Sequence, residues 1–327
     1  MKAYICRRLG LPGEHRVEDI PSPTAAPGQV VIRVKAAGVN FPDTLMVQGK
    51  YQHTPPTPFI SGHEVSGVIK EVSAGVTDYR PGDRIVAFIR HGGFGAFCEE
   101  TVVEADHFLS HLPASVDFVS AAAIPMAYGT AFHSLRKARL KKGETVLVLG
   151  ASGGVGLAAV QLAKLLGARV IACASSEEKL SLCGKLGADA LVNYERDDLR
   201  AAIRQLTDNH GIDVAIDPVG DRFSEAVIRG MAWGGRFCIV GFAGGQIPRI
   251  ALNLVLLKGC ELIGIGVGVN ADRDSTEYVA NQEQMLQWIA DGILQPVISA
   301  TYPLARTADA LEDIMKRKVQ GKVVITM

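Results

Sequence analysis

A glycine-rich segment at residues 151–156, ASGGVG, could hold the pyrophosphate of a dinucleotide. Gly153 and Gly154 lack a Cβ, so the main chain can approach a phosphate closely, and Gly156 allows a helix to pack against a preceding strand. The first N–H groups of that helix would then face the anion. Ala151 takes the first position of the G-x-G-x-x-G pattern, so the tight turn is made with a Cβ present, helped by the glycine before it. The alternative interpretation is a packing turn without a ligand.

Side chains near residue 174 could distinguish NADPH from NADH. Dinucleotide folds that prefer NAD usually end their second strand in Asp or Glu, whose carboxylate accepts hydrogen bonds from the ribose 2′-hydroxyl. Ala174 occupies that position here, followed by Ser175, Ser176 and, one turn later, Lys179. Two hydroxyls and an ammonium can donate to a 2′-phosphate, so we expect a preference for NADPH. The two serines could also simply cap the next helix.

A third group of side chains that could take part in chemistry consists of Asp43, His63 and Glu64. Imidazole and carboxylate groups are competent zinc ligands. One histidine with a neighbouring carboxylate, however, is more often a hydrogen-bonded structural group. We therefore expect no metal at these residues.

The elements that surround the glycine-rich segment are those of a parallel sheet. Thr145 to Leu149 is a continuous apolar run, typical of a strand buried on both faces, and a helical pattern then ends at Gly167. The later strand-type runs are Val170 to Ala174, Ala190 to Val192, Val214 to Asp217, Arg236 to Gly241 and Glu261 to Val267, with helical patterns at Asp198 to Leu206 and Asp221 to Met231. Six strands joined largely by helices predict a doubly wound parallel sheet.

Residues 1–113 carry a different pattern. Short alternating runs, separated by segments rich in Gly and Pro, occur at Val30 to Lys35, Glu64 to Val72, Arg84 to Phe88 and Ala96 to Val103. They predict a mostly antiparallel barrel or sandwich. The tail, with helical patterns near Met285 and from Ala308 to Lys316 and a strand at Lys322 to Thr326, is too small to fold alone. We expect domains at 1–120 and 121–265, with 266–327 returning to the first domain.

Composition excludes several classes of function. Thirty-four basic and 34 acidic residues among 327 give a formal net charge of zero, which does not favour nucleic acid or an anionic membrane surface as a partner. No apolar stretch has the length of a signal peptide or a membrane span. The six cysteines form no C-x-x-C pair, and Cys173 and Cys238 fall inside strand-type apolar runs, so these two are expected to be small core residues and not ligands. These features indicate a soluble cytoplasmic protein.

Five motifs follow one another along the chain: GVNFPD at 38–43, GHEVSGV at 62–68, PGDRIV at 81–86, ASGGVG at 151–156 and GKVVI at the end. In this order they resemble the medium-chain dehydrogenase/reductase superfamily, over essentially the whole length. Within it, the chain looks most like the zinc-free quinone oxidoreductases related to ζ-crystallin. The resemblance implies a GroES-like first domain, a Rossmann second domain and a homodimer built through the nucleotide domains.

The resemblance also implies site residues. Asn40, Tyr51 and Thr130 match positions that line the nicotinamide pocket, and Tyr194 matches one whose side chain commonly contacts the 2′-phosphate. Asn40 could instead hold its loop, Tyr51 could pack and Thr130 could cap a helix. By alignment of motifs, Asn40 stands where zinc-dependent relatives have their first cysteine ligand, and the last ligand falls near Met126. Neither residue is a plausible zinc ligand here.

The remaining cofactor residues follow from the rule that ligands lie at the carboxyl ends of parallel strands. By position and resemblance they are Val155, Val219, Gly220, Gly241, Phe242, Ala243, Ile265, Gly266 and Val267. Arg317 and Lys322 could bind an anionic group of the cofactor or substrate, although basic side chains near a terminus are more often solvated.

Without a metal, reduction of a simple ketone lacks its Lewis acid. A conjugated acceptor needs less help, because the charge left after hydride transfer spreads to oxygen, where donors such as Asn40, Tyr51 and Thr130 could stabilise it. We therefore expect an NADPH-dependent reductase of quinones or α,β-unsaturated carbonyls. One alternative is an enoyl-CoA reductase of the acryloyl-CoA type. An alternative of another class is an NADPH-binding sensor or structural protein without turnover.

Overall fold

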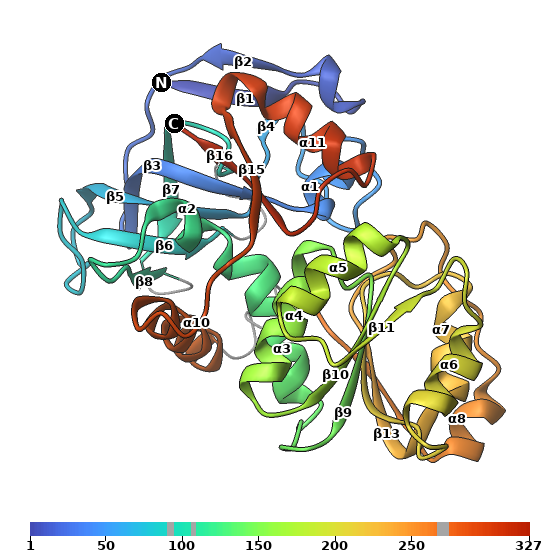
Figure 1. The fold of residues 1–327 in the computed structure, drawn as a ribbon. Helices are drawn as coiled ribbons and strands as arrows, with labels where there is room; N and C mark the ends of the chain where they lie inside the picture. Colours follow the sequence, from blue (N-terminus) through green and yellow to red (C-terminus); the bar gives the residue numbers. More distant parts are fainter. Residues whose placement is uncertain (90–94, 106–108, 267–274) are drawn as a thin grey trace. The chain divides into compact units, whose positions relative to one another are not determined.

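The computed structural model describes residues 1–89, 95–105, 109–266 and 275–327. The chain forms two compact units, one made of Met1–Gly129 with Gly268–Met327 and the other of Thr130–Val267. They are called unit 1 and unit 2 below, and each is described separately (Figure 1). No described helix combines the length and apolar character needed to cross a membrane.

Unit 2 contains a six-stranded parallel sheet in the order β11-β10-β9-β12-β13-β14. Its strands are β9 (Thr145–Leu149), β10 (Arg169–Ala174), β11 (Ala190–Asn193), β12 (Ile212–Asp217), β13 (Met231–Ile239) and β14 (Glu261–Gly264). The first three strands run outward in one direction from the centre and the last three in the other, which confirms the predicted doubly wound sheet.

The helices of unit 2 cover both faces of this sheet. They are α3 (Gly129–Lys137), α4 (Gly154–Leu165), α5 (Glu177–Lys185), α6 (Leu199–Leu206), α7 (Phe223–Arg229) and α8 (Leu252–Lys258). Figure 1 shows α4 and α5 on one face and α6, α7 and α8 on the other. Leu147 and Leu149 of β9 join one core with Ile203 of α6 and Val227 of α7. Because both faces are covered, every residue of β9 is buried.

Several element boundaries in the sequence-based prediction were wrong. The strand expected at Arg236 to Gly241 spans Met231–Ile239. The helix expected to reach Met231 ends at Arg229, because Gly230 caps it and Met231 already pairs with Ile212 in β13. The strand expected to reach Val267 ends at Gly264, and Val267 itself lies outside the described residues. The strand expected from Ala96 begins only at Glu100, because the preceding residues pair with β1 instead.

Unit 1 is mostly antiparallel, as predicted. Its larger sheet has the order β15-β16-β3-β5-β6-β8, with β7 also paired to β3, and a smaller sheet has the order β2-β1-β4. The strands are β1 (Lys2–Cys6), β2 (Arg16–Asp19), β3 (Gln29–Val39), β4 (Phe59–Ile60), β5 (Glu64–Val72), β6 (Arg84–Phe88), β7 (Glu100–Glu104), β8 (Leu109–His111), β15 (Ile298–Pro303) and β16 (Lys322–Thr326). Among these pairs, only β15 and β16 run parallel.

The long strand β3 organises unit 1. Its apolar residues Val30, Ile32 and Val34 enter the core, and its last residues pair with β16, so that Val39 lies opposite Val323. The helical segments of this unit are η1 (Pro12–Glu14), α1 (Phe41–Met46), α2 (Phe118–Ala122), the π-helical turn η2 (Ile124–Tyr128), α10 (Ser275–Ala290), η3 (Leu304–Arg306) and α11 (Thr307–Met315). The C-terminal strand is therefore an interior strand of the sheet that begins near the N-terminus.

Candidate functional site

The glycine-rich segment makes the turn from β9 to α4. Gly150 has a φ of 57°, in the left-handed region that favours glycine, and its carbonyl accepts a hydrogen bond from Gly153 N at 3.0 Å. Gly153 is the N-cap of α4, and the first intrahelical bond runs from Leu157 N to Gly153 O. Ala151 is buried, and its amide donates to Cys173 O of the next strand. Gly150 thus makes the turn that the pattern assigns to position 151.

Two glycines of this turn differ in what surrounds them. A Cβ at Gly156 would lie 2.2 Å from Gly150 O and 2.7 Å from Ala151 C, distances that no real Cβ atom shows. A Cβ at Gly153 would meet its nearest neighbour, the same carbonyl, at 3.4 Å, an ordinary contact. Gly156 is therefore required for close packing of helix on strand. The fold itself does not require glycine at position 153.

The end of β10 brings Ser175, Ser176 and Lys179 together. Ser176 is the N-cap of α5, and its Oγ accepts from Lys179 N at 3.4 Å. Of the two serines, Ser176 therefore has the capping role considered above. The Lys179 ammonium donates to Ser175 Oγ at 3.3 Å. A hydroxyl and an ammonium thus lie side by side where an NAD-preferring fold would have a carboxylate.

Two arginines that sequence reasoning did not name are Arg196, which contacts the first turn of α5, and Arg222, which pairs with Glu195 at 2.5 Å. Arg196 pairs with Glu177 at 2.9 Å, so the acidic first turn of α5 is partly neutralised. Arg222 lies 4.9 Å from the centre of the Phe223 ring, which in turn contacts the Tyr194 ring with centroids 4.4 Å apart. Both arginines follow carboxyl ends of strands, and that position was the available signal.

The side chain of Asp217, the last residue of β12, holds the loop that follows this strand. Its Oδ1 accepts from Val219 N at 2.8 Å and Gly220 N at 2.7 Å, and its Oδ2 accepts from Ser224 Oγ at 2.6 Å. Burial raises the pKa of the Asp217 carboxyl despite these donors. The amides of Val219 and Gly220 are thus committed within the loop.

The neighbouring loop packs on this one. Gly241 N donates to Asp217 O, Ala243 N donates to Pro218 O, and a Cβ at Gly220 would lie 2.7 Å from the Phe242 ring. After β14 ends, Ile265 N still donates to Ile239 O at 2.9 Å, and Gly266 follows. All of these predicted cofactor residues lie along one edge of the sheet, the carboxyl-end edge.

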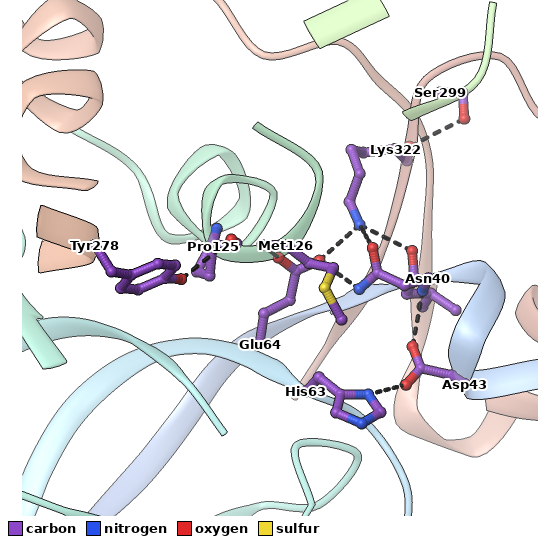
Figure 2. A network of polar contacts seen from close by, with 10 residues as sticks. Asn40, Asp43, His63, Glu64, Pro125, Met126, Tyr278, Ser299 and Lys322 are labelled. Carbon is purple, nitrogen blue, oxygen red and sulfur yellow. Dashed lines mark hydrogen bonds and ion pairs between the residues drawn. The ribbon is translucent and has the colours of Figure 1, made fainter. Parts of the chain in front are cut away.

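Unit 1 contains a buried polar network centred on Glu64 (Figure 2). Lys322 Nζ lies 2.6 Å from Glu64 Oε1 and 2.7 Å from Asn40 Oδ1, and Asn40 Nδ2 donates to the same Glu64 oxygen at 2.7 Å. The exposed fractions are 0% for Glu64, 2% for Lys322 and 8% for Asn40. The expectation that Lys322 is solvated is therefore wrong, because the carboxylate and two further acceptors replace the water around its ammonium.

The second oxygen of Glu64 holds the π-helical turn. Glu64 Oε2 accepts from Met126 N at 2.7 Å, and Tyr278 Oη donates to Pro125 O of the same turn at 3.1 Å (Figure 2). Burial, and then the charge of Glu64, raise the pKa of Tyr278 well above its ordinary value, so the phenol keeps its proton. π-Helical turns are rare and often occur at functional sites.

The groups weighed as zinc ligands are committed to other partners. Asp43 Oδ1 lies 2.6 Å from His63 Nδ1, and Asp43 Oδ2 accepts from Asn40 N at 2.8 Å. A divalent cation on the Glu64 carboxylate would lie against the Lys322 ammonium, which repels it. Over the residues that the structure describes, no cluster of three or more His, Cys, Asp or Glu side chains is suited to a metal. These side chains do not fit a zinc ion.

The other predicted catalytic residues have structural contacts of their own. Tyr51 is half-buried against Met46 and Phe59, and burial, followed by the charge of Asp43, raises its pKa. Thr130 is buried in α3, where its carbonyl accepts from Ser134 Oγ at 2.7 Å, and it belongs to unit 2.

Arg317 is exposed just beyond α11, with a φ of 53°.

Of the predicted catalytic residues, Asn40 belongs to the network of Figure 2 in unit 1, whereas Thr130 lies in unit 2.

Comparison with known proteins agrees with this architecture. A family model described as "Alcohol dehydrogenase GroES-like domain" matches residues 26–114, and one described as "Zinc-binding dehydrogenase" matches residues 154–289. A GroES-like unit followed by a Rossmann-type unit defines a medium-chain dehydrogenase/reductase, a superfamily that binds NAD(P).

Among the relatives, the quinone oxidoreductase-like protein 2 homologue of Nematostella vectensis is 38% identical over 328 residues, covering 99% of this chain and 88% of its own length. The acryloyl-coenzyme A reductase of Metallosphaera sedula is 30% identical over 350 residues, covering 100% of both chains. The crystal structure of Escherichia coli quinone oxidoreductase complexed with NADPH superposes with a TM-score of 0.93 at 26% identity, covering 100% of both chains. The chain belongs to the quinone oxidoreductase family of the medium-chain dehydrogenases/reductases.

Proposed function

We propose that this chain is an NADPH-dependent reductase of quinones or α,β-unsaturated carbonyls that works without a metal. The observation that carries the proposal is the Glu64 carboxylate, whose oxygens are committed to Lys322, Asn40 and Met126. With no metal Lewis acid at this position, the acceptor itself must spread the charge that hydride transfer creates, as quinones and enones do. NADPH, when bound, supplies the hydride.

The protein supplies hydrogen-bond donors and shape. Of the two Nδ2 hydrogens of Asn40, one is donated to Glu64, so the other can point to a substrate oxygen. Tyr51 keeps its proton at neutral pH, because its pKa is raised, and can donate as well. Thr130 is the third proposed donor. Such donors stabilise an oxyanion best when they are held in place before the reaction.

Ser175, Lys179 and Tyr194 support the choice of NADPH, together with the arginines at 196 and 222. The pyrophosphate would lie at Ala151, Gly153, Gly154, Val155 and Gly156, and the loops at 219–220, 241–243 and 265–266 would line the rest of the groove. Replacing Lys179 by Met should lower kcat/KM for NADPH by about 10- to 100-fold, since a hydrogen bond to a charged group contributes about 1.5–3 kcal/mol. The value for NADH should hardly change. Equal losses for both coenzymes would refute the assignment.

A panel of acceptors tests the reaction. NADPH oxidation is followed with 9,10-phenanthrenequinone, a 2-alkenal and crotonyl-CoA. We expect turnover with the quinone or the alkenal. The relative named as an acryloyl-coenzyme A reductase favours a second candidate, reduction of an enoyl thioester, and turnover with crotonyl-CoA alone would replace the first proposal by that one. Tight NADPH binding without oxidation by any acceptor would favour a binding protein instead.

We also propose a homodimer built through unit 2. Large apolar side chains of neighbouring elements β13, α8 and β14 are exposed there, namely Trp233 (80%), Leu252 (75%), Leu256 (77%), Leu257 (68%) and Leu262 (37%). β14 is an edge strand of the sheet, and exposed apolar patches next to free edges are usually covered by a partner. Light scattering should give a dimer for the wild type and for the unit 1 control L11E, and a monomer for L252E/L256E. An unchanged mass for L252E/L256E would refute this interface.

All six cysteines are free thiols. This supports the cytoplasm, a reducing compartment, as the site of action.

A further inference from the structure

The ammonium of Lys322 is fully paired inside unit 1. Its three N–H groups have three acceptors: Glu64 Oε1 at 2.6 Å, Asn40 Oδ1 at 2.7 Å and Val39 O at 2.9 Å. The side chain is 2% exposed, so water contributes little to holding it. A lysine with all donors satisfied in a buried site keeps one geometry, because any rotation would leave a desolvated donor unpaired.

This geometry determines the orientation of the Asn40 amide. Asn40 Oδ1 faces the ammonium and Asn40 Nδ2 faces the carboxylate of Glu64 (Figure 2). A half-turn of the amide would place N–H groups against the ammonium of Lys322 and the amide oxygen against the carboxylate. Both new contacts would be repulsive in a site withdrawn from solvent. The pair of opposite charges therefore fixes which end of Asn40 is the donor.

We propose that Lys322 is a positioning residue for Asn40, an inference that rests on the proposed function of Asn40 as a donor to the reduced acceptor. Lys322 holds Oδ1, Glu64 holds one Nδ2 hydrogen, and the second Nδ2 hydrogen is thereby held in one direction. A donor that needs no reorientation stabilises developing negative charge more strongly than a mobile one. Lys322 itself need not touch the substrate or the cofactor.

Kinetics of single and double variants test this role. Lys322→Met keeps the length of the side chain and removes its charge. We expect kcat to fall by about 10- to 100-fold, as misplacement of a reacting group by about 1 Å can cause, with the Kd for NADPH within about twofold of the wild type. The control Lys318→Met, an exposed lysine near the same terminus, should leave kcat unchanged.

A background without the Asn40 side chain separates positioning from a general structural effect. If Lys322 acts through Asn40, the variant N40A/K322M should have the kcat of N40A, because there is no amide left to orient. Equal fold-losses from K322M in both backgrounds would overturn the inference, as would a wild-type kcat in K322M. If K322M does not fold, K322M/E64Q is compared with E64Q, because the double variant buries no unpaired carboxylate and differs from E64Q only in the ammonium that holds Asn40 Oδ1.

A spectroscopic readout keeps this inference distinct from the proposed function. If the wild type reduces none of the acceptors, the proposed function fails, and the side-chain amide of Asn40 then decides the inference. In protein labelled with ¹⁵N-asparagine, the Asn40 signals are those absent from N40A. We expect them to shift and to exchange faster with solvent in K322M but not in K318M. Unchanged signals in K322M would overturn the inference.

Discussion

Lys322 Nζ lies 2.6 Å from Glu64 Oε1, although 258 positions separate the two residues in the chain. Both side chains are withdrawn from solvent, and each oxygen of the carboxylate has a donor. Opposite charges at this separation attract strongly in a buried site, but both have lost their hydration. Removing one charge of this pair should therefore destabilise the fold more than removing both charges.

The first prediction concerns stability. K322M should lower the free energy of unfolding by about 3–5 kcal/mol, because an uncompensated carboxylate stays buried. The free energy of unfolding should fall less in K322M/E64Q than in K322M, since the double variant removes both charges. Urea denaturation of the wild type, K322M, K322M/E64Q and the control K318M measures these free energies of unfolding. A double variant less stable than K322M would contradict the prediction.

A second prediction contrasts two glycines of the same turn. G153A should fold with nearly wild-type stability, because its Cβ meets only an ordinary contact at 3.4 Å, and should bind NADPH more weakly. G156A should be destabilised, because its Cβ would overlap backbone atoms at 2.2 Å. Thermal unfolding without coenzyme and fluorescence titration with NADPH separate the two effects. Wild-type NADPH affinity in G153A would count against a pyrophosphate at this turn.

The third prediction is a pH dependence due to Asp217. Burial raises the pKa of its carboxyl above the ordinary 3.8, so the folded state binds this proton more tightly than the unfolded state. The stability contributed by the protonated form is present below pH about 3.8 and is lost as pH rises through the folded pKa. D217N keeps acceptor and donor groups for the same neighbours without titrating. Relative to D217N, the wild type should therefore lose stability as pH rises, and a difference independent of pH would contradict this.

The fourth prediction concerns the cysteines. All six are buried, and burial raises the thiol pKa to about 11 for Cys6 and Cys183 and to about 12 for Cys98 and Cys238. Because the thiolate is the reactive form, native protein at pH 8 should react with a disulfide reagent only slowly, and six thiols should react after denaturation. A thiol that reacts within seconds in the native protein would be inconsistent with this burial.

Local signals predicted most of unit 2. Thr145–Leu149 is a strand over the predicted residues, since a run of β-branched and aliphatic residues before a glycine turn needs only its neighbours to be recognised. The network around Glu64 could not be predicted in the same way. Lys322 reads as a solvated residue near a terminus, and only the pairing of β16 with β3 shows that it is buried. The backbone N–H of Met126 donates to Glu64 Oε2 from a π-helical turn, and such a turn has no sequence signature.

The pairing of β16 with β3 also has a consequence for biosynthesis. β3 is made early, but its neighbour β16 leaves the ribosome only after all of unit 2 has been translated. Until then, Glu64 lacks the ammonium that compensates it, and the amide of Asn40 lacks the partner of its oxygen. Unit 1 can therefore reach its final arrangement only after translation of β16, whereas the contiguous unit 2 can fold during synthesis.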